Sequence, residues 1–117
     1  ATIGASDLAK SVAFYQDVLS PLGPQMMDFS DRMKVITGGN GAMLGICTPY
    51  DEKDPAPGNG NMIAIAANDR DQVQAMYDKA ISLGATDEGA PGERAPTFYG
   101  AYFRDLDGNK VCLFKMG

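Results

Sequence analysis

The sequence predicts an α+β domain of two βαβββ modules that form a curved mixed sheet with the helices outside. Three observations predict this fold: residues 2–23 resemble residues 64–84, each copy joins a strand to an amphipathic helix, and three extended segments follow each helix. A module of this kind leaves one sheet face uncovered, so two modules side by side would enclose a concave face. We expect one domain over residues 1–117, with modules at about 1–48 and 61–117 and a linker at 49–60.

The repeat relates the two segments at an offset of 62 residues. After a deletion of one residue, Leu22-Gly23 also matches Leu83-Gly84. The identities are sparse, but both copies predict the same order of elements. The identical pairs are Ile3 and Ile65, Ala5 and Ala67, Asp7 and Asp69, Ala13 and Ala75, and Tyr15 and Tyr77.

Each copy opens with a short apolar strand and continues into a helix with a polar N-cap. The cap is Ser6 or Asp7 in the first copy and Asn68 or Asp69 in the second. Apolar residues then recur at helical spacing, which is typical of a core-facing stripe. The stripes are Leu8, Val12, Tyr15 and Leu19, and then Val73, Met76, Tyr77 and Ala80.

The helices are expected to end at glycines, and extended segments follow. Gly23 and Gly84 suit left-handed C-terminal caps, and Pro21 would end the first helix early. The strands are expected at about 24–29, 33–37 and 42–48, then at 86–90, 98–104 and 109–115. The glycine-rich 38–41 segment predicts a turn, and the segment from 48 to 60, rich in Pro and Gly, predicts the linker.

Composition and charge exclude several classes of function. The formal net charge is −5, and Lys and Arg form no stripe, which argues against binding to nucleic acid or to an anionic membrane surface. No apolar run approaches the roughly 20 residues of a membrane span, and no signal-peptide pattern is present. Cys47 and Cys112 stand far apart, so we expect two reduced thiols and a cytoplasmic protein.

Two motifs carry a resemblance to a known family. "SDLAKSVAFYQDVL" (6–19), followed by Leu22-Gly23, resembles the first helix of the glyoxalase / bleomycin-resistance / dioxygenase (vicinal oxygen chelate) superfamily. "FRDLDGN" (103–109) resembles its final turn, and 89–109 is similar to a subgroup of small single-domain members. The resemblance implies paired modules, often a homodimer, and a cavity where His and Glu ligands hold a divalent metal. Family activities range from lyases and isomerases to dioxygenases and metal-free drug binding, so the fold leaves the function open.

The residues at the ligand positions implied by the resemblance do not suit such a metal. One position falls at Met62, or at Asn61 with a slip of one residue, another at Cys112, and a third just before Ala1. The strand near 42–48 offers no His, Asp or Glu, and the chain contains no histidine. Zn²⁺, Mn²⁺ and Fe²⁺ favour imidazole and carboxylate ligands, so we expect no metal and no other cofactor.

Alternation along the closing strand places Lys110, Cys112 and Phe114 on one face. A four-residue loop would pair Arg104 with Asn109; a five-residue loop would pair Arg104 with Lys110 and set Tyr102 opposite Cys112. Both registers fit the sequence. Lys110 would lower the pKa of the Cys112 thiol and so favour a role as nucleophile, but no histidine is available as its base. Alternatively, Cys112 is a small apolar residue that only fills space. Arg94 and Arg104 could bind a carboxylate.

These observations lead to three hypotheses of function. The first is a metal-free small-molecule-binding protein, the second a metal-dependent lyase, isomerase or dioxygenase-like enzyme whose first ligand precedes Ala1, and the third a metal-free enzyme that uses Cys112 or Tyr102. A homodimer is expected because a symmetric partner would cover sheet edges and the concave face. The expected ligand-binding residues are Thr2, Met62, Tyr99, Tyr102, Cys112 and Phe114.

Overall fold

The first module places one helix against a four-stranded sheet. The computed structural model describes residues 1–38 and 42–117. The elements in chain order are β1 (Thr2–Gly4), α1 (Leu8–Val18), the 3-10 helix η1 (Ser20–Leu22), β2 (Gln25–Ser30), β3 (Met33–Thr37) and β4 (Met43–Cys47). The strand order is β1-β4-β3-β2, with β1 parallel to β4 and the other neighbours antiparallel.

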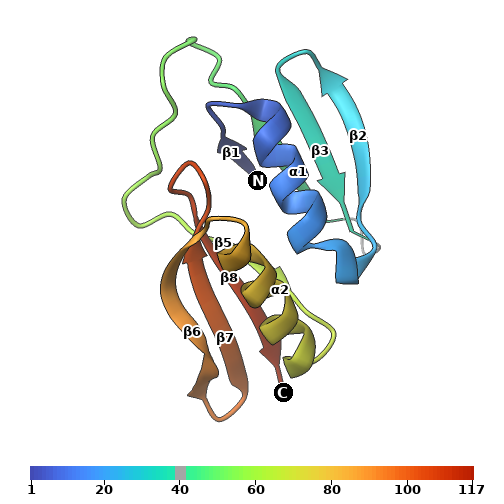
Figure 1. The fold of residues 1–117 in the computed structure, drawn as a ribbon, viewed down its shortest axis with the longest axis vertical. Helices are drawn as coiled ribbons and strands as arrows, with labels where there is room; N and C mark the ends of the chain where they lie inside the picture. The colour runs from blue at the N-terminus through green and yellow to red at the C-terminus, as the bar shows by residue number, and fades with distance from the viewer. Residues whose placement is uncertain (39–41) are drawn as a thin grey trace.

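The second module repeats this topology. Its elements are β5 (Ile63–Ala66), α2 (Arg70–Ser82), β6 (Thr86–Ala95), β7 (Phe98–Arg104) and β8 (Lys110–Met116), and its strand order is β5-β8-β7-β6. β5 is parallel to β8, as β1 is to β4. The predicted pair of βαβββ modules is therefore confirmed, as two sheets that lie side by side (Figure 1).

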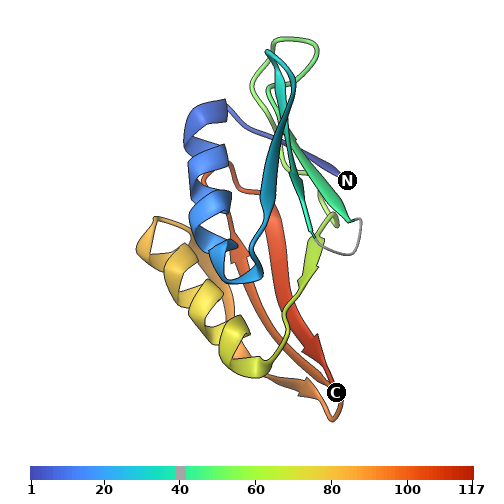
Figure 2. The same cartoon turned by 90° about the vertical axis from the view of Figure 1, so that its right-hand side faces the viewer.

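Both helices cover the same side of the molecule. Figure 2 shows α1 and α2 together on one side of the two sheets, which leaves the opposite sheet faces uncovered. Asp7 caps α1 by accepting from the Lys10 amide, and Asp69 caps α2 by accepting from the Gln72 amide. Gly84 follows α2 with a φ angle of 106°, as a left-handed cap requires, whereas Gly23, with a φ angle of 63°, caps the short helix η1 because α1 already ends at Val18. No helix of the described residues is long and apolar enough to cross a membrane.

The core lies between the helices and the sheets and is shared by the modules. The helix stripes, apart from the partly buried Leu8, are buried together with inward residues of the central strands, among them Ile46, Phe103, Val111 and Leu113. The Phe14 ring on α1 packs edge-on against the Phe103 ring on β7, with ring centroids 6.0 Å apart. A helix of one module thus packs against a strand of the other.

The final turn also joins the modules. The Asp107 carboxylate accepts hydrogen bonds from the backbone amide and the hydroxyl of Ser6, each at 2.9 Å. The Asn109 amide donates to the Gly4 carbonyl at 2.9 Å. The turn that resembles a family motif therefore holds the junction between β1 and α1.

The structure differs from the predicted elements mainly at β6. This strand runs for ten residues to Ala95, whereas the sequence predicted an end near residue 90. Pro91 lies within this strand, because β6 is an edge strand whose pairing with β7 shifts register between Gly89 and Gly92, and such strands tolerate proline. The predicted glycine-rich turn at 38–41 falls mostly on residues 39–41, which lie outside the described residues.

Candidate functional site

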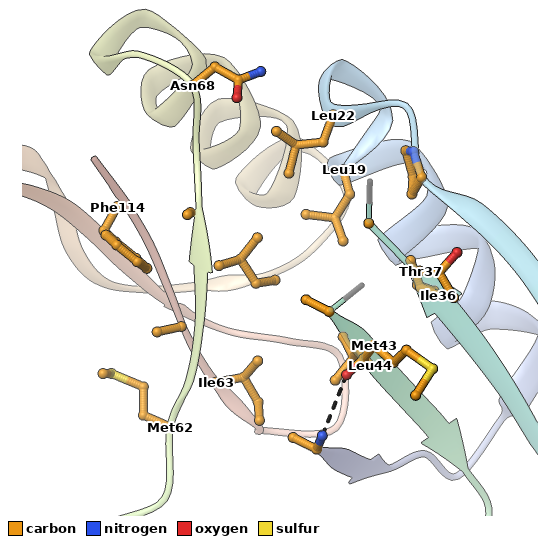
Figure 3. A pocket seen from close by; sticks show the side chains of 17 residues that line it. Leu19, Leu22, Ile36, Thr37, Met43, Leu44, Met62, Ile63, Asn68 and Phe114 are labelled. Carbon is orange, nitrogen blue, oxygen red and sulfur yellow. Dashed lines mark hydrogen bonds between the residues drawn. The ribbon is translucent and has the colours of Figure 1, made fainter. Parts of the chain in front are cut away.

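An apolar cleft of about 650 Å³ lies between the two modules. Figure 3 shows Ile63 of β5 facing Met43 and Leu44 of β4, with Leu19 and Leu22 above them, whereas Met62, just before β5, points to the other side of this segment. Its size falls in the range of small-molecule sites. It is lined by Ala1, Leu19, Leu22, Pro24, Ile36, Thr37, Gly38, Ala42, Met43, Leu44, Met62, Ile63, Ala64, Ile65, Ala66, Asn68 and Phe114.

A second, more polar cleft of about 480 Å³ lies where the linker passes the start of β8. Asn61, Asn109 and Lys110 line it together with Thr2 and residues of the linker. Met62 lines both clefts. Two predicted ligand-binding residues, Thr2 and Met62, therefore meet here rather than beside Cys112.

The uncovered face of the second sheet carries the other predicted residues. Arg104 pairs with Lys110 and Tyr102 pairs with Cys112, so the structure adopts the register of the five-residue loop. Val111 and Leu113 belong to the helix-side core, whereas Lys110, Cys112 and Phe114 alternate with them on the other face. We call this uncovered side of β5, β8, β7 and β6 the open face. Phe114 lies both on the open face and in the cleft between the modules, so the two are continuous.

Tyr99 lies on the opposite side of the sheet. It packs against the helix-side core, and the Arg70 guanidinium of α2 stacks 4.9 Å from its ring centroid. Strand alternation explains the separation, because residues 98, 100 and 102 share one face of β7 and residues 99, 101 and 103 share the other. The expectation that Tyr99 and Tyr102 line the same cavity is therefore wrong.

Cys112 is fully buried beneath the open face. Its side chain has no exposed surface, and a hydrogen bond joins its sulfur to the Tyr102 hydroxyl. Burial raises the pKa of the Cys112 thiol, although this hydrogen bond and the charges of Arg94 and Lys110 act in the opposite direction. The thiol is thus neutral at pH 7, which is unfavourable for a nucleophile or a metal ligand.

Arg94 is the residue of the open face whose position was hardest to predict from the sequence. It follows residue 90, where β6 was expected to end, so no face could be assigned to it. The added length of β6 brings its guanidinium to 5.3 Å from the centre of the Tyr102 ring, while Lys110 reaches the same ring at 5.7 Å. The length of β6 could have been inferred only by accepting Pro91 within an edge strand.

Asp105 and Asp107 organise the final turn and its surroundings. Asp105 Oδ1 accepts from the backbone amides of Asp107 and Asn109, each at 2.9 Å. Gly108 adopts a φ angle of 87° in the same turn, a conformation that favours glycine. These carboxylates therefore hold the turn and its contacts with the first module, because Asp105 Oδ2 also accepts from the Tyr15 hydroxyl and Asp107 accepts from Ser6.

Comparison with known proteins identifies the family. The model of the Glyoxalase/Bleomycin resistance protein/Dioxygenase superfamily matches residues 1–113. The chain belongs to this superfamily. A search of curated proteins gave no match.

Solved structures of this superfamily share the whole fold with the chain. A glyoxalase/bleomycin resistance protein from Albidiferax ferrireducens T118 is 32% identical, with a TM-score of 0.87 over 97% of this chain and 92% of that one. A family enzyme from Burkholderia phytofirmans PsJN is 21% identical, with a TM-score of 0.81 over 100% and 96%. A lactoylglutathione lyase from Agrobacterium tumefaciens is 25% identical, with a TM-score of 0.68 over 97% and 89%.

The residues at the implied metal positions do not fit a divalent ion. Cys112 is a neutral, buried thiol, and Met62 offers only a thioether. Lys110 and Arg94 add positive charge beside Cys112, which opposes a cation. Within residues 1–38 and 42–117, no three His, Cys, Asp or Glu side chains are grouped so that they could hold a metal ion.

Proposed function

We propose that the protein binds a small organic molecule without a metal ion. The observation that carries this proposal is the apolar cleft of about 650 Å³, which both modules line and which continues onto the open face through Phe114. Clefts with apolar walls and few polar groups are the usual form of small-molecule sites. The poor fit of Cys112 and Met62 to a divalent ion supports the same reading.

The side chains that line the cleft determine which class of ligand it can bind and how tightly. The walls consist mainly of aliphatic side chains and Met, with Phe114 as the aromatic residue. An apolar body bound largely by burial of surface is therefore expected, and methionines can adapt to its shape. Affinity should be modest, on the order of 0.3 kcal/mol per ligand atom for drug-sized molecules.

The proposal includes a homodimer in a reducing compartment such as the cytoplasm. Met27 and Met43 expose 55% and 62% of their surface on the uncovered side of the first sheet, an apolar area that a second copy could cover. Cys47 and Cys112 are both free thiols, which suits a reducing compartment.

A glyoxalase-type lyase is the second candidate function. The similarity to the lactoylglutathione lyase from Agrobacterium tumefaciens favours it. It would need metal ligands in addition to Met62 and Cys112. A metal-free enzyme that uses Cys112 or Tyr102 is less well supported, because the Cys112 thiol is buried and its pKa is raised.

Elemental analysis and a binding assay separate these functions. We expect protein purified without chelator to contain no stoichiometric Zn, Ni, Mn or Fe, and one equivalent of such a metal would favour the lyase. A neutral aromatic probe, 2-naphthamide, should bind the wild type. Ala66→Trp should fill the cleft and abolish this binding, whereas Ala9→Trp, exposed on α1, should not. Equal binding by both variants would contradict the proposal.

A further inference from the structure

Two cations gather around one ring on the open face. The Arg94 guanidinium and the Lys110 ammonium lie 5.3 Å and 5.7 Å from the centre of the Tyr102 ring. They come from β6 and β8, the strands on either side of β7. Arg94 also donates to the Ala90 carbonyl, which holds its side chain in place. Positive charge is thus concentrated at one end of the open face.

This charge is not balanced by a carboxylate. Three other cations of the described residues form ion pairs, Lys34 with Asp28, Arg70 with Glu93 and Arg104 with Glu88. Within residues 1–38 and 42–117, neither Arg94 nor Lys110 forms an ion pair, although the chain has 15 acidic residues and 10 basic ones. Two cations that contact the same ring and form no ion pair, in an acidic protein, are a candidate site for an external anion.

Neighbouring carboxylates are already engaged. The charge of Arg94 contributes to lowering the pKa of Asp87, but Asp87 Oδ1 accepts from the Tyr77 hydroxyl and the Gly89 amide, each at 2.8 Å. Glu88 is held at 2.6 Å by Nε of Arg104, the residue that pairs with Lys110. Neither carboxylate forms an ion pair with Arg94 or Lys110.

An aromatic platform lies beside the cations on the same face. The rings of Phe98 and Phe114 are stacked, with centroids 5.6 Å apart and planes 12° from parallel. Gly100 separates Phe98 from Tyr102 along β7, and a Cβ atom at this position would approach the Phe98 ring to 2.9 Å. Glycine therefore lets the ring lie across the strand. The platform is half-buried, so a flat apolar group can still reach it.

We propose that the open face binds an organic monocarboxylate, with its carboxylate group at Arg94 and Lys110 and its apolar body over Phe98 and Phe114. This proposal rests on the proposed function, because it names the class of ligand that the continuous cleft and open face receive. Two cations without further donors suit one carboxylate better than a phosphate ester with its higher charge.

Paired probes test the charge and the apolar body separately. Isothermal titration calorimetry would compare 2-naphthoate with 2-naphthamide, which keeps the same ring system without the charge. We expect wild-type protein to bind the naphthoate about tenfold more tightly, the scale of a hydrogen-bonded charge pair that is partly exposed. Higher ionic strength should reduce this preference, since salt screens exposed charges.

Charge-neutralising variants locate the site. Arg94→Gln and Lys110→Gln should each weaken naphthoate binding several-fold and leave naphthamide binding unchanged. Lys115→Gln is the matched control, because Lys115 has the same charge but pairs with Tyr99 and alternates to the other side of β8. Thermal unfolding of each variant would verify that it is folded.

The outcomes separate this inference from the proposed function. If naphthamide binds as tightly as naphthoate, the carboxylate site is refuted while small-molecule binding stands. If Lys115→Gln weakens naphthoate binding as much as Arg94→Gln, the effect is one of net charge, and the site is also refuted. If neither probe binds at millimolar concentration, both proposals fail.

Discussion

The Tyr15 hydroxyl donates a hydrogen bond of 2.5 Å to Asp105 Oδ2, across 90 residues of sequence and between the two modules. Both residues are buried. Burial and the neighbouring Asp105 carboxylate raise the pKa of Tyr15 well above its ordinary value, so it remains a donor throughout the physiological pH range. Its counterpart in the repeat, Tyr77, instead donates to Asp87 of its own module at 2.8 Å.

Replacing Tyr15 by Phe should destabilise the protein. The variant keeps the ring that packs against Phe14 but removes the donor to a buried carboxylate, a bond worth about 2 kcal/mol. Urea unfolding should give a free energy of unfolding lower by this amount. Tyr50→Phe, at a tyrosine that is 86% exposed, is the control and should be unchanged. Equal stability of the Tyr15 variant would mean that Asp105 finds another partner.

The alkaline limb of stability should depend on Tyr77. Burial and the bond to Asp87 raise its pKa from 10 to about 12 in the folded protein. The unfolded chain therefore loses this proton first, and stability falls as the pH rises from about 10 to 12. In Tyr77→Phe this contribution is absent. The stability difference between wild type and variant should shrink across this window, as chemical unfolding at a series of pH values would measure. A constant difference would contradict the raised pKa.

The two thiols should differ in reactivity. Cys112 is fully buried and neutral, whereas Cys47 is partly exposed. In the folded protein an aromatic disulfide reagent should modify Cys47 within minutes and Cys112 only after denaturant is added. Cys47→Ser isolates the second thiol. Rapid modification of that variant without denaturant would mean that Tyr102 does not protect Cys112.

The assembly should depend on the uncovered face of the first sheet. Light scattering at micromolar concentration is expected to give the mass of a dimer. Met27→Ser combined with Met43→Ser should shift the mass toward the monomer, because the substitutions remove apolar area from the proposed interface. Leu83→Ser, after the end of α2, is the control. A monomeric wild type would refute the dimer.

Local signals in the sequence were enough to predict most of the fold. Asp7 and Asp69 cap their helices as their positions before apolar stripes suggested. The register of the last hairpin stayed open, because both loop lengths are compatible with alternation. It is set by the Asp105 amide, which donates to the Asn109 carbonyl, and by the left-handed Gly108 between them. Such bonds depend on backbone geometry that residue types alone do not specify.

The candidate site was harder to predict than the fold. Strand periodicity alone places Tyr99 and Tyr102 on opposite faces of β7. The prediction that both line one cavity did not take this periodicity into account. The cleft between the modules could not be inferred, because it forms where Leu19 and Leu22 of one module meet Ile63 of the other. That meeting depends on how the modules pack, which no local pattern encodes. Ala66 and Asn68 likewise become lining residues only through this packing.

The hydrogen bonds of the final turn have a consequence for biosynthesis. Ser6 and Gly4 receive their partners Asp107 and Asn109 from 101 and 105 residues further along the chain. The first helix therefore leaves the ribosome long before Asp107 and Asn109, which bind the residues at its start, have been synthesised. The same holds for Asp105, the hydrogen-bond partner of the buried Tyr15. The N-terminal half, although it is one of two similar modules, is expected to remain incompletely ordered until residues 105–109 have been synthesised.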